Sequence, residues 1–270
     1  MTNRTLIKIL AGFLLFVQTA AAPSLVKLVE EDELLPSAAH ARATELITYI
    51  LGTFHYKKTR LDDELSAQIL DRYLESLDPG RYYFLATDVE QFHAAHQHQI
   101  DDYLNNKRLT PVYEVFIQYR KRLSERIAHA IKLLDEPQDF SIDETFEFDR
   151  GEAAWASSRA VLDELWRKRV KNDILSLRLS DKDADATNET LLKRYQGLER
   201  RTKQLDGDDV FQLFINAYTT SIEPHTTYFS PRTSENFKIR MSLSLEGIGA
   251  VLQSDDQFTL VREIVTGGPA

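Results

Sequence analysis

Apolar residues recur every three or four positions along most of the chain, which is the period of an amphipathic α-helix. The stripes are wide enough to face a shared core, so they favour a helical domain over a coiled coil. The helix with the clearest start begins at Thr110, which can cap free backbone N–H groups, followed by Pro111, which has no N–H to satisfy. The pattern predicts helices over residues 43–54, 61–77, 87–106, 110–134, 161–177, 191–205 and 210–222.

Two polar stretches interrupt this helical pattern. In residues 137–156 a few apolar side chains stand among Asp and Glu, which favours a long extended loop anchored to the helices by Phe140, Ile142, Phe146 and Phe148. Residues 180–188 form a second break that contains several Asp. Further on, the Asp206-Gly207-Asp208 segment has the chemistry to cap the helix that follows it.

The pattern changes near residue 241. Residues 241–252 form a glycine-containing β-like run, Asp255-Asp256 indicates a turn, and residues 258–265 predict a second strand. Because a two-stranded hairpin is only marginally stable on its own, we expect these strands to open a new domain that continues beyond Ala270. The predicted fold class is therefore mainly α, with a multi-helix domain over residues 22–240 and the first strands of another domain over residues 241–270.

The first residues resemble an export signal. Arg4 and Lys8 precede an apolar run over residues 9–17, and small residues follow, which is the order found in a secretory signal. The run is much shorter than the roughly 20 residues that cross a bilayer, although an uncleaved N-terminal anchor is the alternative. Pro23 disfavours cleavage directly before it, so we expect residues 1–21 to be removed by cleavage after Ala21, or else after Ala22. This predicts a periplasmic or extracellular protein.

Charge and cysteine content exclude several classes of function. The net charge is −9, and loss of residues 1–21 would remove two Lys or Arg, which gives 31 − 42 = −11. A strongly negative chain argues against nucleic-acid binding, which needs a positive surface. The basic clusters at 120–122, 167–169 and 200–203 stand beside acidic residues and are interpreted as solvated helix faces. The absence of cysteine excludes disulfides, thiolate metal sites and cysteine nucleophiles.

Two polar clusters have the residue types of a chemical site but favour a structural interpretation. His93, His96 and His98 lie close together, yet only the first two share a helix face and no glutamate stands at metalloprotease spacing. They are therefore interpreted as a polar helix face rather than a metal site. The segment 222–228 combines Glu223, His225 and hydroxyl side chains, but no serine is placed as a nucleophile beside His225. We expect Pro224 to end the helix and the polar side chains to fix the turn.

The most informative short motif is Gly247-Ile248-Gly249-Ala250. Glycines directly before a strand allow successive backbone N–H groups to point into one hollow, which suits a carboxylate. The edge of the following strand can then accept an extended peptide as an added strand. The motif is similar to the carboxylate-binding loop of PDZ domains, with an ordinary β-turn as the alternative. In that resemblance the N–H groups of Ile248, Gly249 and Ala250 bind the carboxylate, and the Ile248 side chain lines the pocket for the last apolar residue.

Longer stretches extend this resemblance to a family. The chain resembles the N-terminal portion of the tail-specific proteases, also called C-terminal processing peptidases. The matching stretches are LDRYLESLDPGRYYFLATDVEQF (70–92), DVFQLFINAYTTSIEPHTTYFSPRTSENF (209–237) and MSLSLEGIGAVLQ (241–253), with a weaker match over 139–155.

The resemblance implies a periplasmic serine endopeptidase with a Ser–Lys dyad and with no metal or nucleotide cofactor. Its PDZ domain would capture apolar C-terminal tails, and its helical domain would frame the substrate vault and dock a helical-repeat lipoprotein adaptor. The Ser and Lys would lie beyond Ala270, so no catalytic residue is assigned here and this chain alone is expected to be inactive. Gly247, Ile248, Gly249 and Ala250 are assigned to the carboxylate loop. The alternative is a non-enzymatic helical adaptor or scaffold of the cell envelope.

Overall fold

The computed structural model describes residues 27–180, 183–242, 247–255 and 258–269. The chain divides into two compact units, one of residues 28–246 and a second that contains residues 247–270. The first unit is helical and the second contains one antiparallel hairpin, which confirms the predicted fold class. The predicted export signal over residues 1–21 lies outside the described residues. Within the described ranges, no helix combines the length and the apolar character needed to cross a membrane.

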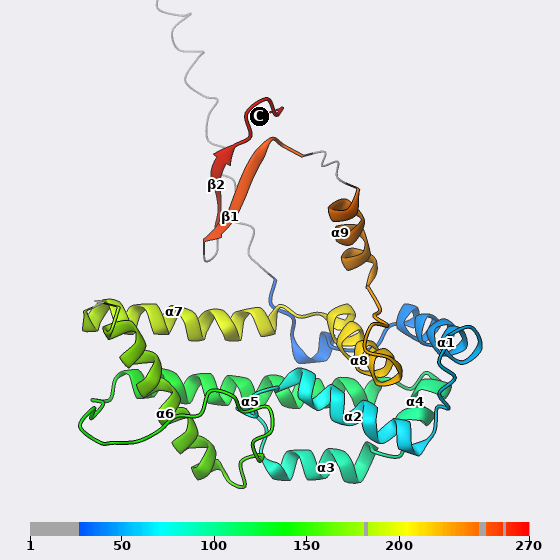
Figure 1. Ribbon diagram of the computed structural model, residues 1–270, viewed down its shortest axis with the longest axis horizontal. Coiled ribbons are helices and arrows are strands. Elements are labelled where there is room, and N and C mark those ends of the chain that lie inside the picture. Colours follow the sequence, from blue (N-terminus) through cyan, green and yellow to red (C-terminus); the bar gives the residue numbers. More distant parts are fainter. Residues whose placement is uncertain (1–26, 181–182, 243–246, 256–257, 270) are drawn as a thin grey trace, which may run out of the picture. The chain divides into compact units, whose positions relative to one another are not determined.

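The first unit contains all the described helices (Figure 1). A 3-10 turn at Glu31–Glu33 precedes the first of them. The α-helices are α1 (Ala38–Thr53), α2 (Asp63–Leu77), α3 (Ala86–His96), α4 (Ile100–Asn106), α5 (Thr110–Leu134), α6 (Arg159–Arg178), α7 (Ala184–Lys203), α8 (Gly207–Ile222) and α9 (Pro231–Met241).

Helix α5 runs through the middle of this unit and is shared by two hydrophobic cores (Figure 1). Its first half contributes residues such as Phe116 to a first core with α1, α2, α4 and α8. Its second half contributes residues such as Leu123 to a second core with α6 and α7, which contains the fully buried Trp166. With 25 residues, α5 is long enough, at roughly 37 Å, to reach both.

The segment between α2 and α3 joins the two cores. The buried Asp78 carboxylate accepts hydrogen bonds from the backbone N–H groups of Tyr82, Tyr83 and Phe84 at 2.8, 2.8 and 3.0 Å. Burial raises the pKa of Asp78, and these hydrogen bonds oppose the rise. The Tyr82 carbonyl in turn accepts a hydrogen bond from Trp166 Nε1 at 2.7 Å. One carboxylate therefore fixes the chain that connects the first core to the second.

The expected continuous helix over 87–106 is two helices in the structure. Helix α3 ends at His96, and α4 begins at Ile100. The break turns the chain so that Ile100, Tyr103 and Leu104 enter the first core. Ser66 in α2 holds the start of α4, because its hydroxyl accepts a hydrogen bond from the Asp101 N–H and donates one to the Asp101 carboxylate, both at 2.9 Å.

Two further helices differ from the sequence prediction. Helix α7 starts at Ala184 because Asp183 caps it, so part of the expected polar break is helical. Helix α9 was not expected, since it is short and polar and buries no side chain. Asp206 caps α8, as expected, and accepts hydrogen bonds from the N–H groups of Asp208 and Asp209.

The second unit contains strands β1 (Ala250–Asp255) and β2 (Phe258–Ile264), which pair antiparallel. Ala250 is opposite Ile264, and the register shifts between Val251 and Leu252. Such a bulge bends a strand and redirects its side chains. The irregularity thus stands directly after the glycine motif.

Candidate functional site

The glycine motif leads into β1 through a left-handed backbone position. Gly249 has φ 72°, a conformation that favours glycine because it has no Cβ. Its carbonyl accepts a hydrogen bond from the Val265 N–H at 2.7 Å, which ties the loop to the end of β2. The Gly268 N–H donates to the Val265 carbonyl at 2.9 Å and closes a turn beside the loop. The second glycine of the motif is therefore required by the geometry of the hairpin.

The side chains around this loop are exposed and apolar. Ile248 is 63% exposed, and the neighbouring Val251 and Leu252 of β1 are exposed as well. No described residue accepts a backbone hydrogen bond from the Ile248 or Gly249 N–H. Among the described strands β1 pairs only with β2, so its second edge is open. The loop therefore offers backbone donors, an apolar side chain and a strand edge, and it contains no titratable side chain.

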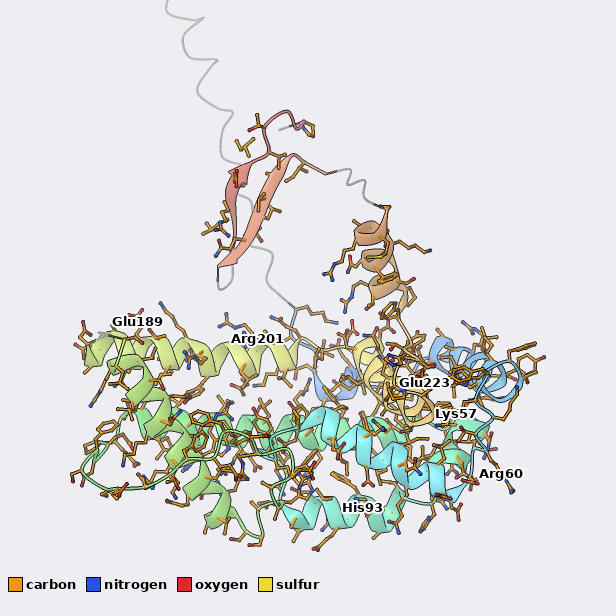
Figure 2. The ribbon with its side chains drawn as sticks, in the orientation of Figure 1. Lys57, Arg60, His93, Glu189, Arg201 and Glu223 are labelled. Atoms are coloured by element: carbon orange, nitrogen blue, oxygen red, sulfur yellow. The ribbon has the colours of Figure 1, made fainter. Side chains whose placement is uncertain are left out.

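The three histidines of the helix-face interpretation have three different partners. His93 Nε2 lies 3.2 Å from an Asp71 carboxylate oxygen (Figure 2). His96 Nδ1 lies 3.0 Å from the Tyr103 hydroxyl, and burial lowers the pKa of this histidine. The exposed His98 lies beside Gln97. His96 is therefore partly buried by packing. The interpretation of all three histidines as an exposed polar helix face is incomplete for this residue.

The polar turn after α8 has the expected structural role. A Glu223 carboxylate oxygen accepts hydrogen bonds from the His225 N–H at 2.9 Å and from the Thr226 hydroxyl at 3.1 Å. His55 Nε2 lies 3.0 Å from the Thr226 hydroxyl, and Lys57 donates to the Ile222 carbonyl at 2.7 Å (Figure 2). The turn is thus fixed to the segment after α1.

The interpretation of the basic clusters as solvated faces is wrong for two arginines. Arg120 is only 6% exposed and donates to the Val29 carbonyl at 2.6 Å. Arg169 packs against Tyr82 and Trp166, with its guanidinium carbon 4.3 and 4.5 Å from the ring centroids. The sequence does not reveal these two positions, because the basic residues stand among acidic ones as they do on a solvated helix face. An arginine can nevertheless bury its aliphatic stem and place its guanidinium against local partners.

The comparisons with known proteins match the helical unit. The family model described as "Tail specific protease N-terminal domain" matches residues 47–232. The chain belongs to the tail-specific protease family. The matched part begins within α1 and ends in the first turn of α9. The Gly247–Ala250 loop lies outside it.

A curated tail-specific protease from Haemophilus influenzae is 39% identical to this chain over 228 residues. The alignment covers 84% of this chain and 33% of the relative. The chain therefore spans about a third of the length of that tail-specific protease.

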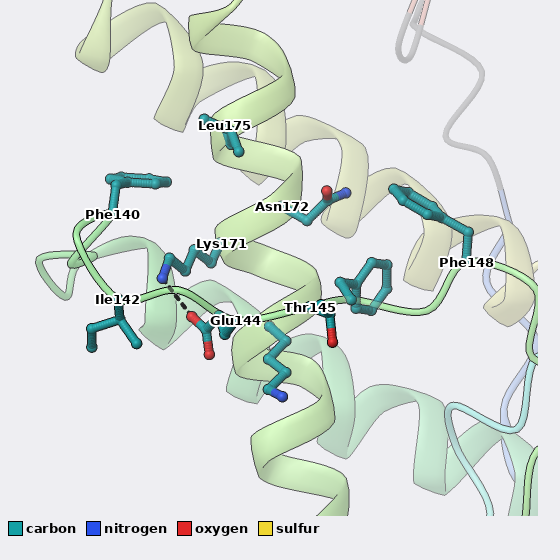
Figure 3. A pocket seen from close by; sticks show the side chains of 10 residues that line it. Phe140, Ile142, Glu144, Thr145, Phe148, Lys171, Asn172 and Leu175 are labelled. Carbon is teal, nitrogen blue, oxygen red and sulfur yellow. Dashed lines mark hydrogen bonds and ion pairs between the residues drawn. The ribbon is translucent and has the colours of Figure 1, made fainter.

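Sequence reasoning missed a second feature of this chain, a surface hollow of about 290 Å³ in the helical unit. It lies between α6 and the loop 135–158, and Figure 3 shows Phe140 and Phe148 at its two ends. The expected anchoring of the loop by four apolar side chains is correct only for Phe140, which packs against the second core. The main anchor is Glu144, which accepts hydrogen bonds from Arg167 and Lys171 of α6.

Proposed function

We propose that this chain is the N-terminal portion of an exported serine endopeptidase that selects proteins by their apolar C-terminal tails. In this proposal a PDZ domain begins near residue 241, and a Ser–Lys dyad outside this chain cleaves the substrate. A neutral, desolvated lysine would accept the serine proton during attack. The observation that carries the proposal is the family match over residues 47–232. The order of the chain agrees with it, because the helical unit precedes a glycine loop and a hairpin.

The Gly247–Ala250 loop has the features that this role requires. The Ile248 and Gly249 N–H groups, from which no described residue accepts a backbone hydrogen bond, suit a carboxylate, and the open edge of β1 suits an extended peptide. The exposed Ile248 side chain supplies apolar surface for the last residue of a tail. A PDZ groove also needs a helix along this strand, and the described part of residues 247–270 contains only the hairpin. We therefore expect this chain by itself to bind tail peptides weakly and to cleave nothing.

Two expectations from the sequence, on export and on an adaptor, are also part of this proposal. Residues 1–21 direct the protein to the periplasm, and the helical unit docks a helical-repeat lipoprotein adaptor. The proposed chemistry involves neither metal nor nucleotide. A chelator therefore leaves the cleavage rate unchanged, whereas a reagent that acylates serine abolishes cleavage.

The test uses the full-length gene product that contains this chain. A folded reporter protein receives a tail that ends in three apolar residues, and a matched reporter ends in three aspartates. We expect tail-dependent loss of the apolar-tailed reporter and no loss of the other, measured by gel electrophoresis over time. This chain alone is the matched inactive control. Equal survival of both reporters would favour the non-enzymatic scaffold.

A further inference from the structure

The first segment of the helical unit, residues 28–35, forms a strap over the short link between α7 and α8 (Figure 1). On the α7 side of the link, the Val29 N–H donates a hydrogen bond to the Lys203 carbonyl at 2.8 Å. On the α8 side, the Leu35 carbonyl passes so close to Gly207 that a Cβ on this glycine would lie 3.2 Å from it. Helix α7 packs in the second core and α8 in the first. The N-terminal strap therefore contacts helix ends that belong to different cores.

The buried Arg120 of α5 fixes this strap to the boundary between the two cores. Its guanidinium donates a hydrogen bond to the Val29 carbonyl at 2.6 Å, which is the acceptor found for it among the described residues. On α5, Arg120 stands about one helical turn from Phe116 of the first core and from Leu123 of the second. Because a buried cation without a hydrogen-bond partner is costly, the burial of Arg120 and the docking of the strap depend on each other.

The first part of the strap has few other contacts. Residues 30–33 are exposed, and an open hollow of about 910 Å³ separates residues 28–32 from α5. Leu34 is the fixed point, since its side chain is fully buried in the first core, whereas Val29 is only partly buried there. A segment with few buried contacts opens at a lower free energy than the core that it covers.

We propose that the N-terminal strap is a latch that couples the two cores at the link between α7 and α8. In the closed state, Arg120 and the Lys203 carbonyl hold Val29, so the end of α7 is tied to the start of α8. In the open state, residues 28–33 swing out about Leu34 and release the last turn of α7. Helix α5 and the Asp78 segment also join the cores, but the latch adds the connection at the end of α7. This inference does not depend on the proposed protease activity.

The test is hydrogen–deuterium exchange of this chain, measured by mass spectrometry. Arg120→Met keeps an apolar stem of similar length and removes the hydrogen-bond donors. We expect exchange about tenfold faster or more in peptides that cover the strap and the end of α7, with α3 unchanged. Lys121→Met is the matched control, because Lys121 is exposed and lines the same hollow, and we expect wild-type exchange in it. Unchanged exchange of the strap and of α7 in Arg120→Met would overturn the proposal.

A variant in the second core tests the coupling itself. Ile174→Ala in α6 removes a buried side chain, and with the latch closed we expect faster exchange in α8 as well as in α6. Combined with Arg120→Met, its effect on α8 should fall about threefold or more, while its effect on α6 remains. Val29→Pro opens the latch from the other side, because proline has no N–H for the Lys203 carbonyl, and it serves if Arg120→Met does not fold. If the strap opens and the effect on α8 stays the same, the strap is only a packed terminus and the latch is contradicted.

Discussion

His40 Nε2 lies 2.6 Å from an Asp208 carboxylate oxygen, although 168 residues separate them in the sequence. The other ring nitrogen, Nδ1, accepts a hydrogen bond from the Ser37 N–H at 3.0 Å, so Nε2 carries the proton that is donated to Asp208. The imidazole also stacks on Phe211 with ring centroids 4.6 Å apart. The first turn of α1 is therefore held against the first turn of α8 by a buried and fully engaged histidine.

Replacement of this histidine should destabilise the helical unit. We expect His40→Ala to lower the free energy of unfolding by about 2–4 kcal/mol, because it removes the stacking contact with Phe211 and the hydrogen bonds of the imidazole and leaves a cavity at a buried position. Urea unfolding followed by circular dichroism measures the change. The matched control is His225→Ala, since His225 is exposed and only its backbone N–H is bonded, so its change should stay within about 0.5 kcal/mol. Equal effects of the two variants would contradict this account.

The hydrogen bonds that hold the loop 135–158 against α6 should persist at acidic pH. Hydrogen bonds from Arg167 and Lys171 lower the pKa of Glu144 from 4.5 to about 2. A lowered folded-state pKa means that the stabilisation is fully present above pH 4.5 and is lost as the pH falls towards about 2. In a carboxyl NMR titration we expect Glu144 to remain ionised at pH 3.5. A midpoint near the ordinary value would show that the anchor is absent in solution.

A matched pair of variants assigns the cause of this shift. Arg167→Ala should raise the pKa of Glu144 towards its ordinary value, because Arg167 is the larger of the two contributions. Arg159→Ala should leave it unchanged, since Arg159 is exposed and lies near Asp163 instead.

The helices that could be predicted from the sequence are those whose burial follows a simple period. Helix α5 is the clearest case, because apolar residues from Val112 to Leu134 repeat along one face and Pro111 marks the start. The break between α3 and α4 was missed, since the apolar period continues across it and tertiary packing decides where the chain turns. Helix α9 was missed because it buries no side chain and thus leaves no apolar stripe.

The two candidate sites also differ in whether the sequence alone could reveal them. The Gly247–Ala250 loop could be found from the sequence, because a left-handed glycine before a strand has a local signature. The hollow beside α6 could not, since it depends on Glu144 meeting Arg167 and Lys171, more than 20 residues away. Arg120 and Arg169 were misjudged for the same reason, because their partners are distant in sequence.

The helical unit should fold without the hairpin. Both hydrophobic cores consist entirely of residues between Val29 and Tyr228. We therefore expect a fragment of residues 25–240 to give a helical circular dichroism spectrum and a cooperative urea transition. Phe214→Ala, in the first core, should lower its stability by about 3–5 kcal/mol. A spectrum dominated by β signal, or a non-cooperative transition, would contradict an autonomous helical unit.

Export should remove the first residues of the chain. Intact-mass measurement of protein recovered from the periplasm should give a mature chain that begins at Ala22 or Pro23, because Pro23 restricts the cleavage position. Ala21→Arg should block cleavage after Ala21, since the signal peptidase site requires a small residue directly before the cut. A mature chain that still begins at Met1 would favour the uncleaved anchor.

The central claim is that the protein recognises the C-terminal carboxylate of its substrates. The most direct test compares how tightly two forms of one peptide bind to the full-length gene product. The peptide ends in three apolar residues, once as the free acid and once as the amide, and isothermal titration calorimetry measures both affinities. We predict that the free acid binds at least tenfold more tightly, because charge-assisted hydrogen bonds from the loop to a carboxylate contribute about 1.5–3 kcal/mol. We also predict that Gly249→Pro removes the difference, since proline cannot adopt φ 72° and has no N–H. Equal affinity for the acid and the amide, or an unchanged preference in Gly249→Pro, would contradict the assignment of Gly247–Ala250 as the carboxylate loop.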